Sequence, residues 1–181
     1  MKGLFLKYKA VLRFILFFIG TYVVLSLLYG GYLSLSKGGD YPPDFVTNLV
    51  AKQSSAVLTS LNYNAAIVPN ENAPSMKLLV NDYYLADIIE GCNAISIIIL
   101  FIAFIVAFYE KAKKTVLFIF AGAVLIYAVN IIRIVFLTIA LYEYPEYQEF
   151  LHSIVFPAII YGMVFLLWII WVRMLKPETH A

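Results

Sequence analysis

Four long apolar segments constrain this chain more than any other feature of its sequence. They run from Val11 to Leu35, from about Cys92 to Tyr109, from Thr115 to about Tyr142, and from about Ser153 to Leu175. A helix needs about 20 predominantly apolar residues to cross the hydrocarbon core of a bilayer. The sequence therefore predicts about four transmembrane helices. The first segment is too long, and lacks the small-residue cleavage site, to be a removed signal peptide.

The composition agrees with a protein embedded in a membrane. Apolar residues make up 63% of the 181 residues and charged residues only 13%, whereas soluble domains carry about half and about a quarter. The single cysteine excludes an intrachain disulfide and a multi-cysteine zinc site, and we expect no cofactor. No basic run with interleaved aromatic residues points to nucleic acid. We predict a mainly α fold: a polytopic membrane helical bundle with a small α+β extracytoplasmic insert.

The distribution of charge orients the predicted bundle, because short cytoplasmic loops of membrane proteins are rich in Lys and Arg. The basic residues that flank the segments are Lys2, Lys7, Lys9 and Arg13 at the first, Lys111, Lys113 and Lys114 between the second and third, and Arg173 and Lys176 at the end of the fourth. The link between the third and fourth segments instead carries Glu143, Glu146 and Glu149 and no base. Both termini are therefore predicted to be cytoplasmic, with this acidic link and the insert outside.

A polar insert between the first two apolar segments is the one part of the chain that resembles a soluble domain. Two prolines and Asp44 form a helix start signal before the stretch FVTNLVAKQSSAVLTSLNY, whose apolar positions have helical spacing. The stretches MKLLV and YYLADII flank an Asn-Asp pair and predict a β-hairpin.

We divide the chain into the cytoplasmic N-terminus with the first transmembrane helix (1–35), the insert of a helix plus a hairpin (36–91), transmembrane helices two to four with the candidate site (92–175), and a cytoplasmic tail (176–181).

Three chemically distinctive side chains are predicted to lie at one depth, near the outer surface of the membrane. Cys92 begins the second apolar segment there. Arg133 lies 17 residues beyond Val116, which is about 26 Å along a helix that crosses a core about 30 Å thick. His152 opens the fourth segment directly after the acidic outer link. Chain order and topology together bring these three residues to the outer face.

A cysteine, a histidine and an arginine together suit nucleophilic catalysis on a carbonyl carbon. The thiol of Cys92 must become a thiolate to attack, and a nearby cation, a histidine or a helix N-terminus favours that form. His152 is the candidate general base and acid, and Arg133 is the candidate stabiliser of the oxyanion. Asn130, three residues before Arg133 on the same helix face, is a supporting candidate that orients the guanidinium or the substrate.

Each of these residues also has a purely structural interpretation. A single cysteine in an apolar protein is commonly inert packing, and an arginine near the end of a span commonly reaches to lipid headgroups. His152 fits an interface residue among neighbouring tyrosines, and Asn130 fits a hydrogen bond between helices. Two points favour function: a free thiol facing an oxidising compartment is a liability, and an arginine inside a span is costly without a polar partner.

Three short motifs occur in a fixed order along the chain. Gly91-Cys92-Asn93-Ala94 opens one apolar span, Asn130-x-x-Arg133-Ile134 lies late in the next, and His152 opens the last. In this order the chain resembles the exosortase/archaeosortase family of membrane cysteine enzymes. The stretches YPPDFVTNLVAKQSS and NDYYLADIIEGCNAISIIILFIAF are similar to the compact exosortase F type, and the resemblance extends from Tyr41 to Gly162.

The resemblance implies an enzyme of the bacterial inner membrane with its active site facing the periplasm. It implies a cysteine peptidase or transpeptidase, with Cys92, Arg133 and His152 as the catalytic set. Such an enzyme cleaves the C-terminal sorting signal of envelope proteins through a thioester on the cysteine. Its protein substrates carry a short C-terminal motif, a transmembrane helix and a basic tail, and they pass to an envelope acceptor whose identity the sequence does not name.

The chain departs from the family pattern in two respects. Many members have more spans than the four predicted here. The family's cysteine is often followed by a small residue and then by Gly, as in Cys-Ser-Gly, where this chain has Asn93-Ala94. Whether the backbone amides after Cys92 complete an oxyanion hole is therefore left open by the sequence.

Two other classes of function remain open from the residues. A non-enzymatic membrane assembly or scaffold subunit would bind a partner through the extracytoplasmic insert and would tolerate single changes at Cys92, Arg133 and His152. A small transporter is disfavoured, because the midsections of the second and fourth segments contain no acid or base. The sequence does not decide between water and an amine as acceptor, and it does not give the oligomeric state.

Overall fold

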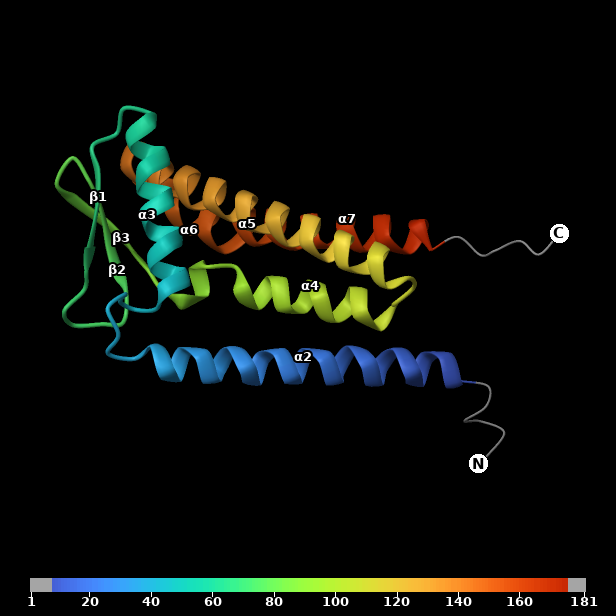
Figure 1. Cartoon of the computed structure of the whole chain (residues 1–181). Helices are drawn as coiled ribbons and strands as arrows, with labels where there is room; N and C mark the ends of the chain where they lie inside the picture. The colour runs from blue at the N-terminus through green and yellow to red at the C-terminus, as the bar shows by residue number, and fades with distance from the viewer. Residues whose placement is uncertain (1–7, 176–181) are drawn as a thin grey trace.

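The computed structural model describes residues 8–175 and is mainly helical (Figure 1). Its helices are α2 (Lys9–Ser36), α3 (Phe45–Ser60), α4 (Ile95–Ala107), α5 (Ala112–Glu143), α6 (Gln148–Phe150) and α7 (Phe156–Met174). Its strands are β1 (Ala65–Pro69), β2 (Met76–Val80) and β3 (Tyr83–Ile88). Two 3₁₀ turns, η1 (Glu90–Cys92) and η2 (Pro145–Tyr147), and a π-helical turn, η3 (Leu151–Val155), complete the described elements. The flanking Lys2, Lys7 and Lys176 and the predicted tail (176–181) lie outside the described residues.

Three helical stretches of the described residues are long and apolar enough to cross a membrane. They are Val11–Ser36, Ala112–Glu143 and Pro145–Met174, the last of which runs through η2, α6, η3 and α7. The second predicted span is the exception, since its helix α4 has only 13 residues. That length is about 20 Å, less than the roughly 30 Å of a hydrocarbon core. The described residues thus hold three helical stretches long enough to span a membrane, together with the apolar helix α4, which is shorter than the second predicted segment.

The shortening of α4 has a local cause at its N-terminal end. Ala94 has a φ of 64°, in the left-handed region that a right-handed helix of L-residues does not continue through. The side chain of Asn93 accepts a hydrogen bond of 2.9 Å from the amide of Ile95, the first residue of the helix. The apolar run that begins at Cys92 in the sequence therefore opens with a turn, and the helix starts three residues later.

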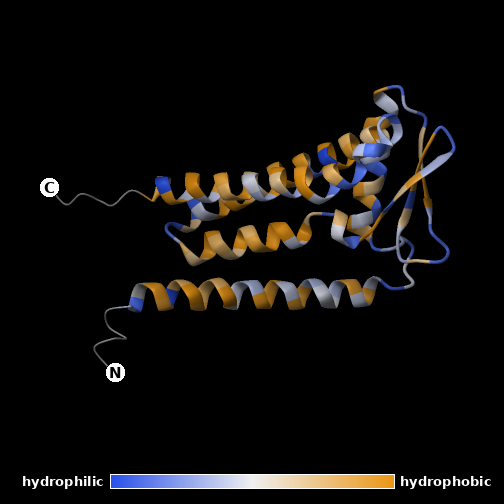
Figure 2. Cartoon of the chain, turned by 180° about the vertical axis from the view of Figure 1, so that it is seen from behind, coloured by the Kyte–Doolittle hydropathy of each residue, from blue (hydrophilic) through white to orange (hydrophobic). Residues whose placement is uncertain are grey.

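The membrane-spanning part consists of α2, α4, α5 and α7, which run side by side (Figure 1). These helices are mostly apolar along their length, whereas the strands contain both apolar and polar residues and the loops around them are mostly polar (Figure 2). Helix α4 lies between α2 on one side and α5 and α7 on the other. The structure is thus a polytopic helical membrane protein with a small α+β insert, as predicted.

The insert holds α3 and a three-stranded antiparallel sheet of order β1-β2-β3. Helix α3 begins after Asp44, whose Oδ1 accepts hydrogen bonds from the amides of Val46 and Thr47 at 3.0 and 3.1 Å. The predicted hairpin is β2–β3, and its turn residues Asn81 and Asp82 have φ values of 50° and 66°, as a type I′ turn requires. Strand β1 was missed, because AAIVP is rich in alanine and ends in proline, two poor strand signals.

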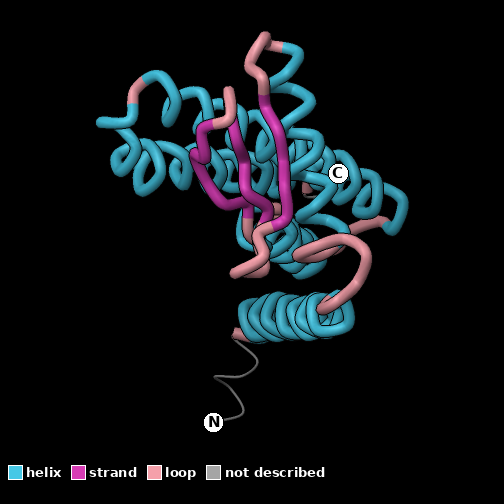
Figure 3. The backbone as a smooth tube through the Cα atoms, turned by 90° about the vertical axis from the view of Figure 1, so that its left-hand side faces the viewer, coloured by secondary structure: helices cyan, strands magenta, loops and turns pink. Residues whose placement is uncertain are grey.

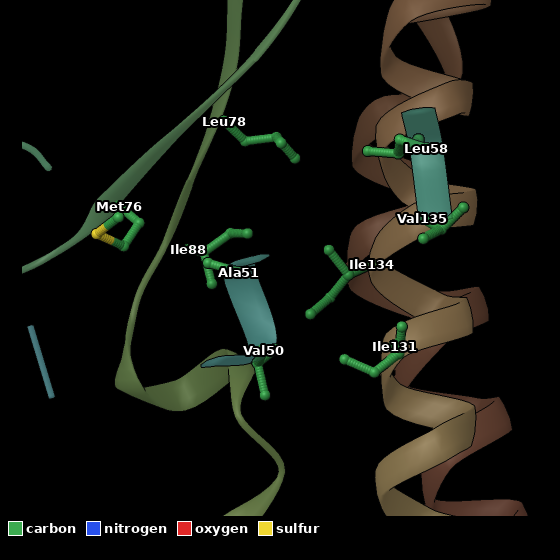
Figure 4. Packing of buried hydrophobic residues seen from close by; sticks show 9 residues of the cluster. All are labelled: Val50, Ala51, Leu58, Met76, Leu78, Ile88, Ile131, Ile134 and Val135. Atoms are coloured by element: carbon green, nitrogen blue, oxygen red, sulfur yellow. The ribbon is translucent and has the colours of Figure 1, made fainter. Parts of the chain in front are cut away.

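A buried apolar cluster fixes the insert to the C-terminal half of α5 (Figure 4). It consists of Val50, Ala51 and Leu58 of α3, Met76 and Leu78 of β2, Ile88 of β3, and Ile131, Ile134 and Val135 of α5. Burying one such aliphatic side chain stabilises a fold by about 1.5–3 kcal/mol. The view from the sheet side shows the strands in front of the helices, with the helix nearest the N-terminus set apart (Figure 3). The sheet therefore has a fixed position over one end of the bundle.

Candidate active site

A cavity of about 320 Å³ lies at the end of the bundle next to the insert, between β3 and the helices α5 and α6–η3. Its lining includes Cys92, Arg133 and His152, the three residues predicted to lie at one depth. Residues 84–88 of β3 also line it. Three elements far apart in the sequence thus place their distinctive side chains around one space. The volume is within the range of small-molecule and peptide sites.

Cys92 is the last residue of the turn η1 and is half-buried. Its backbone N–H donates a hydrogen bond of 2.9 Å to the carbonyl of Ile89. Its own carbonyl accepts a hydrogen bond of 2.6 Å from Nδ2 of Asn130 on α5. Both backbone groups of the cysteine are therefore held, which fixes the position of this residue in the cavity wall.

Asn130 connects the cysteine to the arginine through one side-chain amide. The residue is only 1% exposed, so its polar atoms depend on partners within the protein. While Nδ2 donates to Cys92, Oδ1 accepts from Nη1 of Arg133 at 3.5 Å, a long hydrogen bond. The residue suggested by the sequence as a supporting group thus contacts both the guanidinium and the backbone of the candidate nucleophile.

Arg133 is half-buried and lies between two cavities. One is the cavity that holds Cys92, and the other is an apolar cavity of about 300 Å³ between α5 and η3–α7, with Phe136 and Phe156 in its walls. Nε of Arg133 is buried and has no hydrogen-bond partner among the described residues. An unpaired buried donor costs about 1–3 kcal/mol. An acceptor atom placed beside this guanidinium would therefore be stabilised.

His152 lies in the π-helical turn η3, is exposed, and lines the cavity from the side opposite β3. The turn has a local cause in Pro157, which stands near the start of α7. Proline has no N–H, so the carbonyl of Ser153, four residues earlier, receives no helical hydrogen bond from it. Single π turns within helices are frequent at functional sites. Here the wider turn carries the only histidine among the described residues.

Asn93 is a functional candidate that the sequence analysis did not select. It is 1% exposed, and its Nδ2 donates to the hydroxyl of Tyr29 at 2.8 Å and to Oγ1 of Thr47 at 3.0 Å. These bonds tie the residue after the cysteine to α2 and to α3. The only sequence signal was a polar side chain directly after Cys92, and its partners lie 64 and 46 residues away.

Two backbone amides after Cys92 are committed to the turn that carries it. The amide of Asn93 donates to the carbonyl of Glu90 at 3.2 Å, and the amide of Ile95 donates to Oδ1 of Asn93 at 2.9 Å. Neither is free to stabilise an oxyanion in this arrangement. The guanidinium of Arg133 is the cationic donor in the walls of the same cavity.

Asp87 of β3 is another residue in the cavity wall that was not selected from the sequence. Its Oδ1 accepts from Ser75 Oγ at 2.9 Å and from Asn70 Nδ2 at 3.2 Å, and its Oδ2 accepts from the hydroxyl of Tyr84 at 2.9 Å. Desolvation opposes the charge of Asp87, but these hydrogen bonds outweigh it and hold the pKa of the carboxyl below its usual value. The hydrogen bond to Asp87 raises the pKa of Tyr84. The carboxylate is thus ionised at neutral pH.

Comparison with known proteins gives one match. The sequence model of the transmembrane exosortases (Exosortase_EpsH) matches residues 4–174, nearly the whole chain. Among curated proteins and solved structures, none matches the chain.

Proposed function

The chain belongs to the transmembrane exosortase family, and from this membership we propose that it is a membrane-embedded cysteine protease or transpeptidase. It cleaves the C-terminal sorting signal of envelope proteins through a thioester on Cys92. The observation that carries the proposal is the common cavity of Cys92, Arg133 and His152. A nucleophile, a proton carrier and a cation around one space are the groups that acyl transfer needs.

The proposed reaction begins when the thiol of Cys92 passes its proton to His152 and becomes a thiolate. The sulfur attacks the carbonyl carbon of the scissile peptide bond, and the guanidinium of Arg133 stabilises the oxyanion of the tetrahedral intermediate. When the C–N bond breaks, His152 returns the proton to the leaving amine. The acyl group remains on the sulfur as a thioester.

The second half of the proposed reaction releases the acyl group from Cys92. Water or an amine attacks the thioester carbonyl, His152 takes the proton of the attacking group, and the sulfur leaves as a thiolate. Water as acceptor makes the protein a protease, and an amine of the envelope makes it a transpeptidase. The same three side chains serve both outcomes.

The finer identity belongs to the same proposal. The insert and the Glu-Gly-Cys-Asn-Ala turn support the compact exosortase F type. The basic residues between α4 and α5 and after α7 support a bacterial inner-membrane protein with both termini in the cytoplasm. With that orientation, the cavity faces the periplasm. Its substrates would carry a C-terminal motif, a transmembrane helix and a basic tail.

The decisive experiment replaces Cys92 in the full-length protein in its own cells. Cys92→Ala should insert at the wild-type level, while unprocessed precursors of envelope proteins accumulate, as measured by their mass and by quantitative proteomics. Gly162→Ala, on an exposed position of α7 with no atom within 4 Å of the added methyl, is the matched control and should process normally. Normal processing by Cys92→Ala would instead favour a scaffold that binds a partner through its insert.

A further inference from the structure

We propose that the free edge of β3 binds an extended segment of the protein substrate, which adds to the sheet as a fourth strand and ends beside Cys92. The proposal rests on the proposed function and specifies how that same site recognises a polypeptide. It commits to one occupant: an extended main chain, whose own N–H and C=O groups pair with those of β3.

The first observation is that β3 has a partner on one side only. The sheet order is β1-β2-β3, and β3 pairs with β2 from Val80↔Tyr83 to Met76↔Ile88. In the described part of the chain, no backbone hydrogen bond joins β3 to an element other than β2. The other edge therefore presents main-chain donors and acceptors that a further strand can use.

The second observation is where this edge lies. Residues 84–88 line the same cavity as Cys92, Arg133 and His152. Edge strands are commonly blunted by lysine, proline, other charges or bulges. YYLADI contains no lysine or proline, and its one charged side chain, Asp87, is engaged by hydrogen bonds from within the insert. The free edge of β3 thus borders the cavity of the candidate catalytic groups, and the sequence of β3 leaves this edge accessible to another strand.

The third observation is a bulge in β3. Leu78 pairs with Ala86 and Leu79 pairs with Tyr84, so Leu85 has no partner residue in β2. Bulges are frequent at sheet edges next to active sites, where they redirect a side chain. Leu85 and Leu137 of α5 both line the cavity, which gives alternate side chains of a paired segment an apolar surface to contact.

The fourth observation is the direction of the chain. Strand β3 ends at Ile88, and the turn η1 that follows ends at Cys92. A segment paired along β3 is therefore led to the thiol at its end. In such strand addition, main-chain hydrogen bonds supply affinity and alternate side chains supply specificity. A lipid or a small soluble ligand would make no comparable use of a strand edge.

The test uses two variants at Leu85 in the full-length protein. The probes are the envelope proteins whose precursors accumulate in Cys92→Ala cells. Leu85→Pro deletes the amide at the bulge, a position that proline tolerates in edge strands, whereas Leu85→Ala shortens the side chain and keeps the amide. We expect Leu85→Pro to slow precursor processing tenfold or more and Leu85→Ala to change it less than threefold, at equal protein levels. Equal rates for the two variants would overturn the proposal.

A second measurement does not depend on the folding of the proline variant. In the Cys92→Ala background, a photoreactive phenylalanine replaces Tyr84 on β3 or Val68 on β1, the opposite edge; these side chains are 56% and 41% exposed. The Tyr84 position should cross-link the accumulated precursors at least tenfold more than Val68. Equal yields would contradict binding at β3 while leaving the proposed function intact. If Cys92→Ala accumulates no precursor at all, the proposed function itself fails.

Discussion

Nδ2 of Asn130 donates a hydrogen bond of 2.6 Å to the backbone carbonyl of Cys92, so a buried residue of α5 holds the turn that precedes α4. The two residues are 38 positions apart. Because Oδ1 of the same amide accepts from Arg133, one side chain sets the relative position of the candidate nucleophile and the candidate oxyanion stabiliser. Asn130 is thus a positioning residue that acts through its two neighbours.

Replacing Asn130 should impair processing more than it impairs folding. Asn130→Ala leaves the carbonyl of Cys92 and a guanidinium N–H without this partner, and it should lower the free energy of unfolding by about 1–3 kcal/mol. Asn130→Asp keeps the acceptor for Arg133 but loses the donor to Cys92. Both should slow precursor processing at least tenfold at a temperature where both remain folded, as judged by melting in detergent. Wild-type processing by Asn130→Asp would remove the link to Cys92 from the mechanism.

Lysine should not replace Arg133. The planar guanidinium of Arg133 can donate from Nη1 to Asn130 while Nε stays available for another acceptor, and a lysine ammonium does not have this geometry. Loss of one preorganised oxyanion donor commonly slows acyl transfer by about 10²–10³, and we expect a decrease of that order in the processing rate of Arg133→Lys. Arg13→Lys is the matched control, because Arg13 stands over Phe17 at the other end of the bundle. Similar losses in both variants would indicate a general effect of arginine on membrane insertion.

The grouping of Cys92, Arg133 and His152 around one cavity could be predicted from the sequence, because membrane thickness turns residue counts into expected positions. Basic residues mark the start of the third span, so the position of Arg133, 17 residues beyond Val116, has few alternatives. The same reasoning overestimated α4, since an apolar run does not reveal the left-handed residue at its start.

The contacts that hold the site could not be predicted in the same way. Asn93 donates hydrogen bonds to Tyr29 and Thr47, which are 64 and 46 residues away in the sequence. These residues come into contact only when α2 and α3 have packed against the rest of the chain. Membrane topology fixes depth but not rotation about a helix axis, which the packing of side chains decides. Local β-propensity likewise did not predict strand β1 or the position of β3 at the edge of the sheet.

Glycine should be favoured over alanine at position 94. The φ of 64° costs an L-residue about 1–2 kcal/mol, which glycine avoids. Ala94→Gly gives up one buried methyl group, so we expect a net increase of about 1 kcal/mol or less in the free energy of unfolding, measured by melting in detergent. Ala103→Gly is the control within the regular helix of α4, also buried, and should lower stability by about 1 kcal/mol or more. Equal losses in the two variants would show that the left-handed turn is not maintained.

The hydrogen bonds to Asp87 should appear as a pH dependence of stability. Because the folded state depresses the pKa of this carboxyl, ionised Asp87 stabilises the fold above its unfolded pKa of about 3.9, and the contribution is lost as the pH falls through the folded value. The difference in melting temperature between wild type and Asp87→Asn should therefore be largest near pH 6–7 and diminish below about pH 4. Tyr84→Phe removes one of the donors and should give a smaller difference of the same sign. A difference that stays constant with pH would contradict this assignment.

Close packing of α4 against α5 depends on the absence of a side chain at Gly122. A Cβ at this position would overlap the ring of Phe101, which is fully buried. We expect Gly122→Ala to lower the free energy of unfolding by about 1–3 kcal/mol through overpacking. On the exposed side of α7, Gly162→Ala meets no atom within 4 Å and should be neutral or stabilise the helix by up to about 1 kcal/mol. Melting temperatures in the same detergent compare the two substitutions directly.

A double-mutant cycle identifies the contact responsible. Phe101→Leu removes part of the ring that the new methyl group would overlap, so it should cost stability in the wild-type background and recover part of the loss in Gly122→Ala. Residues in direct contact show coupling of about 0.5–3 kcal/mol, whereas distant ones add. Because the Cys92 turn precedes the N-terminal end of α4 and α5 carries Arg133, loosening this contact should also slow processing. Strict additivity of Gly122→Ala and Phe101→Leu would exclude the direct packing of these two residues.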